Sequence, residues 1–183
     1  MRLAPDQLAY VNLANYTLAL QRFDETRQNI HEAQARGLDN YLLHSALYAL
    51  AFGGAGSAAM AEQQTWFAGK PEENFGLALA SDTEAYGGHL AKARELTKRA
   101  VDSAIRADSK ESGAVWQANA ALQQAAYANS AEARRTAAEA LKLAPASQGV
   151  EVEAALAFAM AGDTARAESL AQDLGYSARY KSM

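Results

Sequence analysis

The sequence predicts an all-α fold, and three observations support that class. Roughly a quarter of the 183 residues are Ala, the residue with the highest helix propensity, and only three are Pro. No segment shows the sustained alternation of β-branched and polar residues that is typical of strands. A short sequence segment also recurs along the chain, each time a few residues after a Gly, Asn or polar break. Its copies begin at Phe23, Leu90, Ser130 and Thr164. We therefore expect repeated amphipathic helices.

The helices are expected to pair into about five hairpins, or about ten antiparallel helices, because a unit of about 34 residues is typical of helical repeats. The expected units are about 8–40, 41–71, 72–110, 111–146 and 147–175, within one repeat domain over residues 8–175. The third unit, for example, is expected to contain helices from Glu73 to Tyr86 and from Leu90 to Ala107. Gly37 and Pro145 are expected to end helices, since Gly accepts a left-handed conformation and Pro cannot continue a helix.

Both ends of the chain suggest a fragment of a longer array. The segment Arg2-Leu3-Ala4-Pro5 echoes Lys142-Leu143-Ala144-Pro145, so residues 1–7 are expected to be the remnant of an upstream repeat. Residues 176–183 show no apolar periodicity and are expected to form a non-repeat tail. Terminal repeats without a polar cap would also allow self-association between chains.

Composition excludes several function classes. The net charge of −4 argues against nucleic-acid binding, and no run of about 20 apolar residues is present to span a membrane. The absence of Cys excludes disulfides and thiolate metal sites but leaves the compartment open, cytoplasmic or extracytoplasmic. The cationic segment from Lys92 to Lys110 is best interpreted as a solvated helix face with weak ion pairs, the alternative being a patch for an acidic partner.

Catalytic and cofactor-binding signals are weak. His31, His44 and His89 have no helix-spaced partner and are expected to be surface or interface residues rather than ligands or bases. The Gly-rich segment 54–59 imitates a dinucleotide fingerprint, but it is expected to follow a helix rather than a strand. We expect no catalytic residue, no metal site and no cofactor, and therefore no enzyme in this chain.

A binding groove for a protein or peptide is the stronger expectation, because the first helix of each stacked hairpin lines a concave face. The repeat register places ten candidates in it: Val11, Asn15, Leu18, Ser45, Ala49, Phe75, Asp82, Tyr86, Ala118 and Leu122. The alternative for Phe75 and Tyr86 is packing between neighbouring units. Trp66 and Trp116 are expected to fill gaps between helices.

From Ala9 to about Leu174 the chain resembles the tetratricopeptide repeat family. The residues that carry the resemblance are Tyr10, Leu13, Ala14, Phe23, Ala33, Ala93, Ala133, Ala140, Pro145 and Ala167. The resemblance implies a right-handed α-solenoid that acts as a non-catalytic protein-interaction scaffold. The chain departs from the subtype that clamps chaperone tails, because Val11 and Ala46 replace polar clamp residues.

A narrower resemblance is to the C-terminal repeat region of bacterial eukaryotic-like serine/threonine kinases. It rests on the segment from Lys92 to Val101, the segment from Trp116 to Leu122, and the segment from Ala161 to Ala167. It implies a sensory or regulatory region of a membrane-anchored kinase, on the periplasmic side, with catalysis elsewhere in the parent chain. The Gly-rich loop, strand lysine and H-R-D motif of a kinase domain are absent from this sequence.

Overall fold

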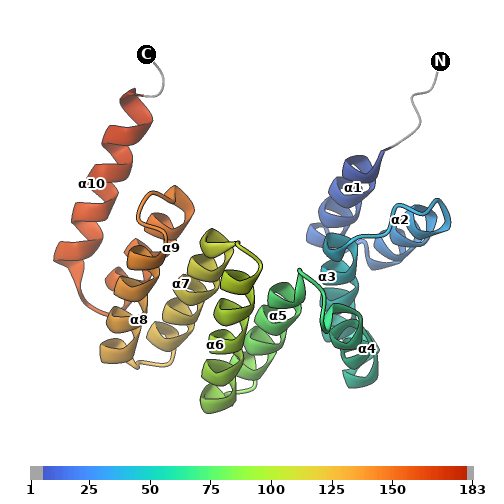
Figure 1. Ribbon diagram of the computed structural model, residues 1–183, viewed down its shortest axis with the longest axis horizontal. Helices are drawn as coiled ribbons and strands as arrows, with labels where there is room; N and C mark the ends of the chain where they lie inside the picture. The colour runs from blue at the N-terminus through green and yellow to red at the C-terminus, as the bar shows by residue number, and fades with distance from the viewer. Residues whose placement is uncertain (1–5, 181–183) are drawn as a thin grey trace. The chain divides into compact units, whose positions relative to one another are not determined.

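The computed structural model describes residues 6–180, apart from the side chains of residues 55 and 176–180. Over these residues it contains ten α-helices, one π-helical turn and no strand, which confirms the all-α class (Figure 1). The elements are α1 (Gln7–Ala19), α2 (Phe23–Ala35), α3 (Tyr41–Leu50), η1 (Ala51–Ala55), α4 (Ser57–Phe67), α5 (Glu73–Tyr86), α6 (Leu90–Arg106), α7 (Lys110–Ala126), α8 (Ser130–Leu143), α9 (Gln148–Met160) and α10 (Thr164–Tyr180).

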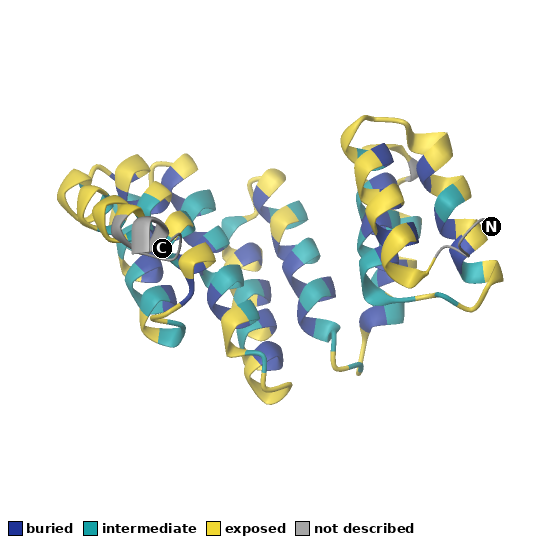
Figure 2. Ribbon diagram, turned by 90° about the horizontal axis from the view of Figure 1, so that it is seen from above, coloured by how far each residue is buried: buried dark blue, intermediate teal, exposed yellow. Residues whose placement is uncertain are grey.

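The chain divides into two compact units, Met1–Leu79 and Ala80–Met183. The division falls within α5 and not at a border of the five predicted units. In the first unit α1 packs on α2 and α3, and α3 packs on α4. In the second unit α7 packs on α6, α8 and α9, and α9 packs on α8 and α10. Figure 2 shows buried and exposed residues alternating along the helices, as expected for amphipathic segments.

Each copy of the recurring sequence segment follows a turn between two helices, and the geometry of this turn also recurs. At four of these turns a residue with positive φ is followed by one whose backbone N–H bonds to the carbonyl five residues back, at 2.8 or 2.9 Å. The positive-φ residues are Gln21, Gly88, Ala128 and Gly162, and the N–H donors are Arg22, His89, Asn129 and Asp163. This Schellman geometry satisfies carbonyls that the helix end leaves unpaired. The last two turns are separated by 34 residues.

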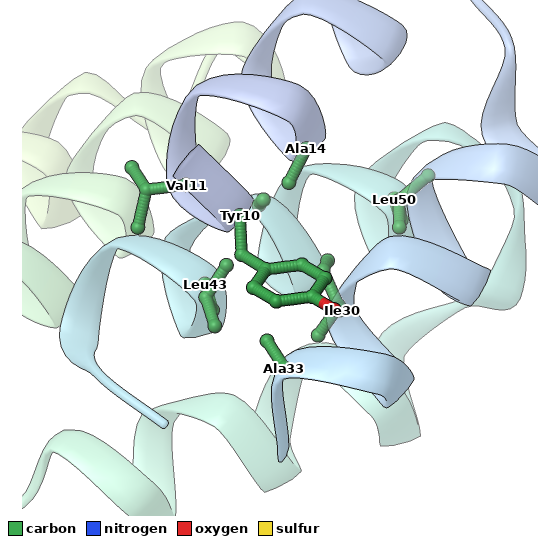
Figure 3. Close-up of a cluster of buried hydrophobic side chains, with 8 residues drawn as sticks. Tyr10, Val11, Ala14, Ile30, Ala33, Leu43 and Leu50 are labelled. Atoms are coloured by element: carbon green, nitrogen blue, oxygen red, sulfur yellow. The ribbon is translucent and has the colours of Figure 1, made fainter. Parts of the chain in front are cut away.

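The core of the first unit lies between α1, α2 and α3 (Figure 3). The ring of Tyr10 is buried among aliphatic side chains that include Ile30 and Leu43, and each such burial contributes about 1.5–3 kcal/mol. A buried hydroxyl pair also joins α1 to α2, because Thr26 Oγ1 lies 3.0 Å from Thr17 Oγ1.

The core of the second unit consists largely of alanine. Three clusters of buried residues join α7 and α8 to α9, and Phe158 and Val150 are their only large members among the fully buried residues described. Small side chains let helix axes approach toward the short end of the usual 8–10 Å range. An Ala-rich sequence can therefore still form a dry interior, although each position contributes little apolar area.

The predicted helix borders agree closely with the structure in the third unit and less well at the ends of the chain. Helix α10 continues to Tyr180, so residues 176–180 of the predicted non-repeat tail are helical, while residues 181–183 lie outside the described part. At the other end Asp6 caps α1, its Oδ1 accepting the N–H of Ala9 at 2.8 Å. Asp6 is thus the N-cap and Gln7 the first residue of α1, and residues 1–5 of the predicted remnant lie outside the described residues.

Candidate functional site

A polar hollow of the second unit has a volume of about 480 Å³ and lies between α6, α7 and α8. A volume of this size is within the range of about 300–1,000 Å³ that ligand sites occupy. Its lining residues come from three helices: Arg94, Thr97, Lys98, Val101, Gln117, Ala120, Gln124, Glu132, Arg135, Thr136 and Glu139. We call this feature the α6–α8 hollow.

Helical spacing explains how these side chains meet. Arg94, Thr97, Lys98 and Val101 are three or four residues apart and therefore share one face of α6. The same spacing places the polar residues of α8 on one face, opposite α6. Gln117 and Gln124 are seven residues apart, two turns of α7, and contribute polar groups between the two walls.

Hydrogen bonds between side chains hold this polar surface in place. Thr136 Oγ1 donates to Gln124 Oε1 at 3.1 Å, and both residues are buried. Gln117 Nε2 donates to Glu139 Oε2 at 2.9 Å. Two polar bridges thus fasten α7 to α8, and buried groups that are already paired present a defined surface rather than a mobile one.

Charge is divided unevenly between the two walls. On α8, Arg135 bonds to Glu132 through Nε at 3.1 Å and Nη2 at 2.5 Å, and its Nη1 lies 3.3 Å from Glu139 Oε1. The hydrogen bond from Arg135, with the charges of Arg135 and Arg94, lowers the pKa of the Glu132 carboxyl.

The wall formed by α6 carries two cations that have no carboxylate partner among the described residues. Within the described part of the chain, neither Arg94 nor Lys98 forms an ion pair with a carboxylate. The α6–α8 hollow therefore has two available cations on α6 opposite an α8 wall in which one guanidinium is shared by two carboxylates, so its lining carries a net charge of +1 and two cations that can accept a carboxylate.

Two of the predicted groove residues are buried in the cores of their own units. Ala118 is 0% exposed and Val11 is 5% exposed, because each packs in a core cluster of its own unit. Leu122 is partly buried against the alanine core, and Leu18 is partly buried against the core of the first unit. These four side chains contact neighbouring helices of the same chain.

The other candidates in the first unit lie at or near the surface. Asn15 is exposed, while Ser45 and Ala49 are half-buried, and Ser45 Oγ donates to the carbonyl of Tyr41 within its own helix. The Phe75 ring packs against the Tyr41 ring with centroids 4.6 Å apart. The alternative interpretation, in which Phe75 fills a gap between helices, describes this contact.

The remaining candidates, Asp82 and Tyr86, lie where α5 meets α7 in the second unit. Gln123 Nε2 donates to Asp82 Oδ1 at 2.5 Å, and the hydroxyl of Tyr127 donates to the carbonyl of Ala85 at 2.7 Å. Asp82 retains an exposed side chain, yet desolvation by the surrounding chain raises the pKa of its carboxyl, and the hydrogen bond from Gln123 partly offsets that effect. The Tyr86 side chain is 78% exposed. Asp82 therefore bonds within its own chain, whereas the Tyr86 side chain is largely open to solvent.

A cluster around His44 was not anticipated from the sequence. The ring is buried and stacks on Trp66 with centroids 3.7 Å apart, while Lys70 Nζ lies 3.2 Å from the centroid of the Trp66 ring. Nδ1 lies 2.7 Å from Gln63 Oε1, and Nε2 lies 3.0 Å from Asp39 Oδ2. Both ring nitrogens are therefore engaged, which favours a structural role over acid–base chemistry.

His44 thus lies at an interface between helices, one of the two placements expected for the histidines, and His31 has the other, at the surface. His31 is exposed, and His89 is exposed and pairs with Glu84 through Nδ1 at 2.8 Å. The signal missed at His44 is long-range, since Gln63 and Trp66 belong to the following helix, α4. An acidic residue five positions before His44 was the one local indication.

The described residues contain neither a metal-binding cluster nor a membrane-spanning helix. No group of three or more His, Asp or Glu side chains suited to a metal ion occurs among the residues described. Within residues 6–180, no helix combines the length and the apolar character that crossing a bilayer requires. No protein-family model, curated protein or solved structure matches the chain.

Proposed function

We propose that this chain is a non-catalytic interaction module that binds a peptide segment of a partner protein. The α6–α8 hollow would accept an acidic side chain, or a terminal carboxylate, of that segment. The observation that carries the proposal is the pair of cations, Arg94 and Lys98, that line the hollow without a carboxylate partner among the described residues. Charge-assisted bonds from both cations would fix the peptide, and Val101 and Ala120 would contact its apolar atoms.

The face proposed here differs from the one expected from the sequence. The sequence register favoured the first helix of each hairpin, whereas the hollow is built mainly on the second helices, α6 and α8. The burial of Val11 and Ala118 argues against a binding groove on the first helices. The proposal adopts the alternative interpretation of the segment from Lys92 to Lys110, in which this segment is a patch for an acidic partner.

We further propose that the hairpins are units of a tetratricopeptide-like, right-handed solenoid. Support comes from the four turns of one geometry and from the 34-residue separation of the last two. The kinase resemblance leads to a regulatory role that stays a prediction, since no described contact favours it over an independent interaction module.

The test uses a library of short peptides that contain Asp or Glu, each with a matched Asn or Gln version. Binding would be measured by fluorescence anisotropy at low and moderate salt. We expect selected acidic peptides to bind at least about tenfold more weakly to the variant Arg94→Ala/Lys98→Ala, because each lost charge-assisted bond contributes roughly 1.5–3 kcal/mol. Added salt should weaken binding to the unmodified chain.

The matched control is Lys92→Ala/Arg99→Ala, which removes two cations of α6 that pair with Glu95 and do not line the hollow. This variant should retain the affinity of the unmodified chain. Equal loss in both variants would indicate a general charge effect and would contradict the site. Equal binding of the amide versions of the peptides would contradict carboxylate recognition.

A further inference from the structure

An apolar groove of about 400 Å³ lies between α9 and α10 of the second unit, and we call it the α9–α10 groove. Val152 and Leu156 of α9 are 45% and 52% exposed in it, while Ala167, Ala171 and Leu174 of α10 form the opposite wall. A contiguous apolar surface that is open to solvent usually marks a contact site. The repeat register indicates what kind of element fits it.

The groove has an equivalent 34 residues earlier, and that equivalent is filled. The turn at Ala128 corresponds to the turn at Gly162, which aligns α7 and α8 with α9 and α10. The five lining residues named above, in the same order, correspond to Ala118, Leu122, Ala133, Ala137 and Ala140. These residues pack around α9 and its C-cap residue, which insert Val150, Ala154, Ala157 and Ala161.

The first unit contains a second filled example. Aligning the turn at Gln21 with the turn at Gly162 places Val11, Thr26, Ile30 and Ala33 at the positions of Val152, Ala167, Ala171 and Leu174. Helix α3 fills this groove with Leu43 and Leu50, and Leu47 packs against the same core. A groove in this register therefore accepts large aliphatic side chains as well as alanine.

Helix α1 carries side chains at the same register positions that α9 uses to fill its groove. Among the described residues, no other helix covers them. In the same alignment, the residues that α9 and its C-cap insert correspond to Ala9, Leu13, Tyr16 and Leu20 of the first unit. The three large side chains are exposed: Leu13 by 46%, Tyr16 by 68% and Leu20 by 67%. The positions of Leu13 and Tyr16 are those that Leu47 and Leu50 occupy on α3. The chain thus carries both an open groove and a helix face in the register that fills such grooves.

We propose that the α1 face of one chain, formed by Leu13, Tyr16 and Leu20, docks into the α9–α10 groove of a second copy. The contact would repeat between chains the packing that already joins α9 to α7 and α8 within one chain. Because the two surfaces differ, the association is heterologous, or head to tail, and can continue beyond a dimer. It uses neither Arg94 nor Lys98, so it stands independently of the peptide site.

The rim of the groove differs in charge from its filled equivalent, so the occupant is argued from the apolar register. Within the chain, Arg134 Nη1 donates to the carbonyl of Ala161, two residues before Asp163, at 2.8 Å. In the proposed contact Glu168 takes the place of Arg134, and Arg22 takes the place of Asp163. Arg134 bonds to a backbone carbonyl, and Glu168 cannot replace it as a donor. Both Asp163 and Arg22 already pair within their own segments, with Arg166 and Glu25.

The test measures mass against concentration by light scattering and sedimentation. We expect the average mass of the unmodified chain to rise with concentration without stopping at the dimer. Tyr16→Asp removes the inserting face, and Leu156→Asp blocks the groove, because each places a charge in an apolar contact. Each variant alone should need at least about tenfold more protein to associate. Both positions are exposed, so the variants should fold, which circular dichroism would verify.

The decisive arm mixes the two variants. Tyr16→Asp retains an intact groove and Leu156→Asp retains an intact α1 face, so the mixture should form a one-to-one dimer that cannot elongate. The control is Ile105→Asp, a change at an exposed position of α6 outside both surfaces, which should associate like the unmodified chain.

Three results would overturn the proposal. The first is an unmodified chain that stays monomeric at all concentrations. A monomer in which α1 docks into the groove of the same chain would count as this result. The second is an association that stops at a symmetric dimer. The third is a mixture of the two variants that forms no dimer.

Discussion

Gly76 of α5 lies directly against Phe67 of α4, so closely that a Cβ added to Gly76 would be 2.7 Å from both Cβ and Cγ of the Phe67 side chain. Phe67 is one of the largest fully buried side chains of the first unit. A hydrogen bond also joins the two helices at this point, since Gln64 Nε2 donates to the Gly76 carbonyl at 2.7 Å. The missing side chain of Gly76 is what allows α5 to approach α4 at this point.

Gly76→Ala is therefore expected to destabilise the chain, although Ala in a helix is usually favoured over Gly by about 1 kcal/mol. Overpacking against a buried ring typically costs about 1–3 kcal/mol, which exceeds that gain. Denaturant unfolding would measure the difference. The control is Gly149→Ala in α9, where the nearest atom to an added Cβ is Ser147 Oγ at 3.8 Å, and there stability should rise or stay unchanged. Equal effects at both sites would contradict the close contact.

His44→Ala is expected to lower the free energy of unfolding by about 2–3 kcal/mol. The substitution removes the stack on Trp66 and leaves Gln63 and Asp39 without their imidazole partner. His44→Phe, which retains a ring for stacking, should lose less. The exposed His31→Ala is the control and should change stability by less than about 0.5 kcal/mol. If His44→Ala matched this control, the cluster would have no structural role.

Glu153→Met is expected to stabilise the chain at neutral pH by about 1 kcal/mol, because one carboxylate oxygen of Glu153 is buried without a hydrogen-bond partner among the described atoms. Burial raises the pKa of Glu153 in the folded chain. The folded state therefore takes up a proton more readily than the unfolded state, and the unmodified chain recovers stability as the pH falls through that raised value. The advantage of Met should shrink on acidification, as measured by unfolding at several pH values. The exposed Glu62→Met is the control, and an equal gain there would contradict the burial argument.

Arg135→Ala is expected to raise the pKa of Glu132, and Arg94→Ala to raise it by a smaller amount. The hydrogen bond from Arg135 is the largest cause of the lowered value, and Arg94 contributes only through its charge. A lowered carboxyl pKa stabilises the folded chain above the ordinary value, and that contribution is lost as the pH falls through the folded value. An NMR titration of the Glu132 carboxyl would measure both shifts. An unchanged titration in Arg94→Ala would place Arg94 away from the hollow.

Local chemistry accounts for the part of the fold that the sequence predicted. The borders of α5 and α6 agree with the prediction within one residue, because Gly87-Gly88 and the adjoining Ala-rich runs act within a few residues of themselves. The candidate groove was harder to predict. Ala118 belongs to a helix with alanine on several faces, and its apolar pattern does not show which face a neighbour covers. The α6–α8 hollow was harder still, since its cationic segment has the pattern of a solvated helix surface.

The sequence by itself determined the class of this protein: ten helices, their approximate limits, and a turn that returns along the chain. These features depend on helix propensity and on the backbone freedom of a few residues, which are properties of short segments. Only the tertiary structure decided that Val11 is buried while Tyr16 is exposed, and that Arg94 and Glu132 line one hollow. Such pairings arise because packing brings together faces of helices that are far apart in sequence, and the free energy of burial depends on the neighbour as much as on the residue.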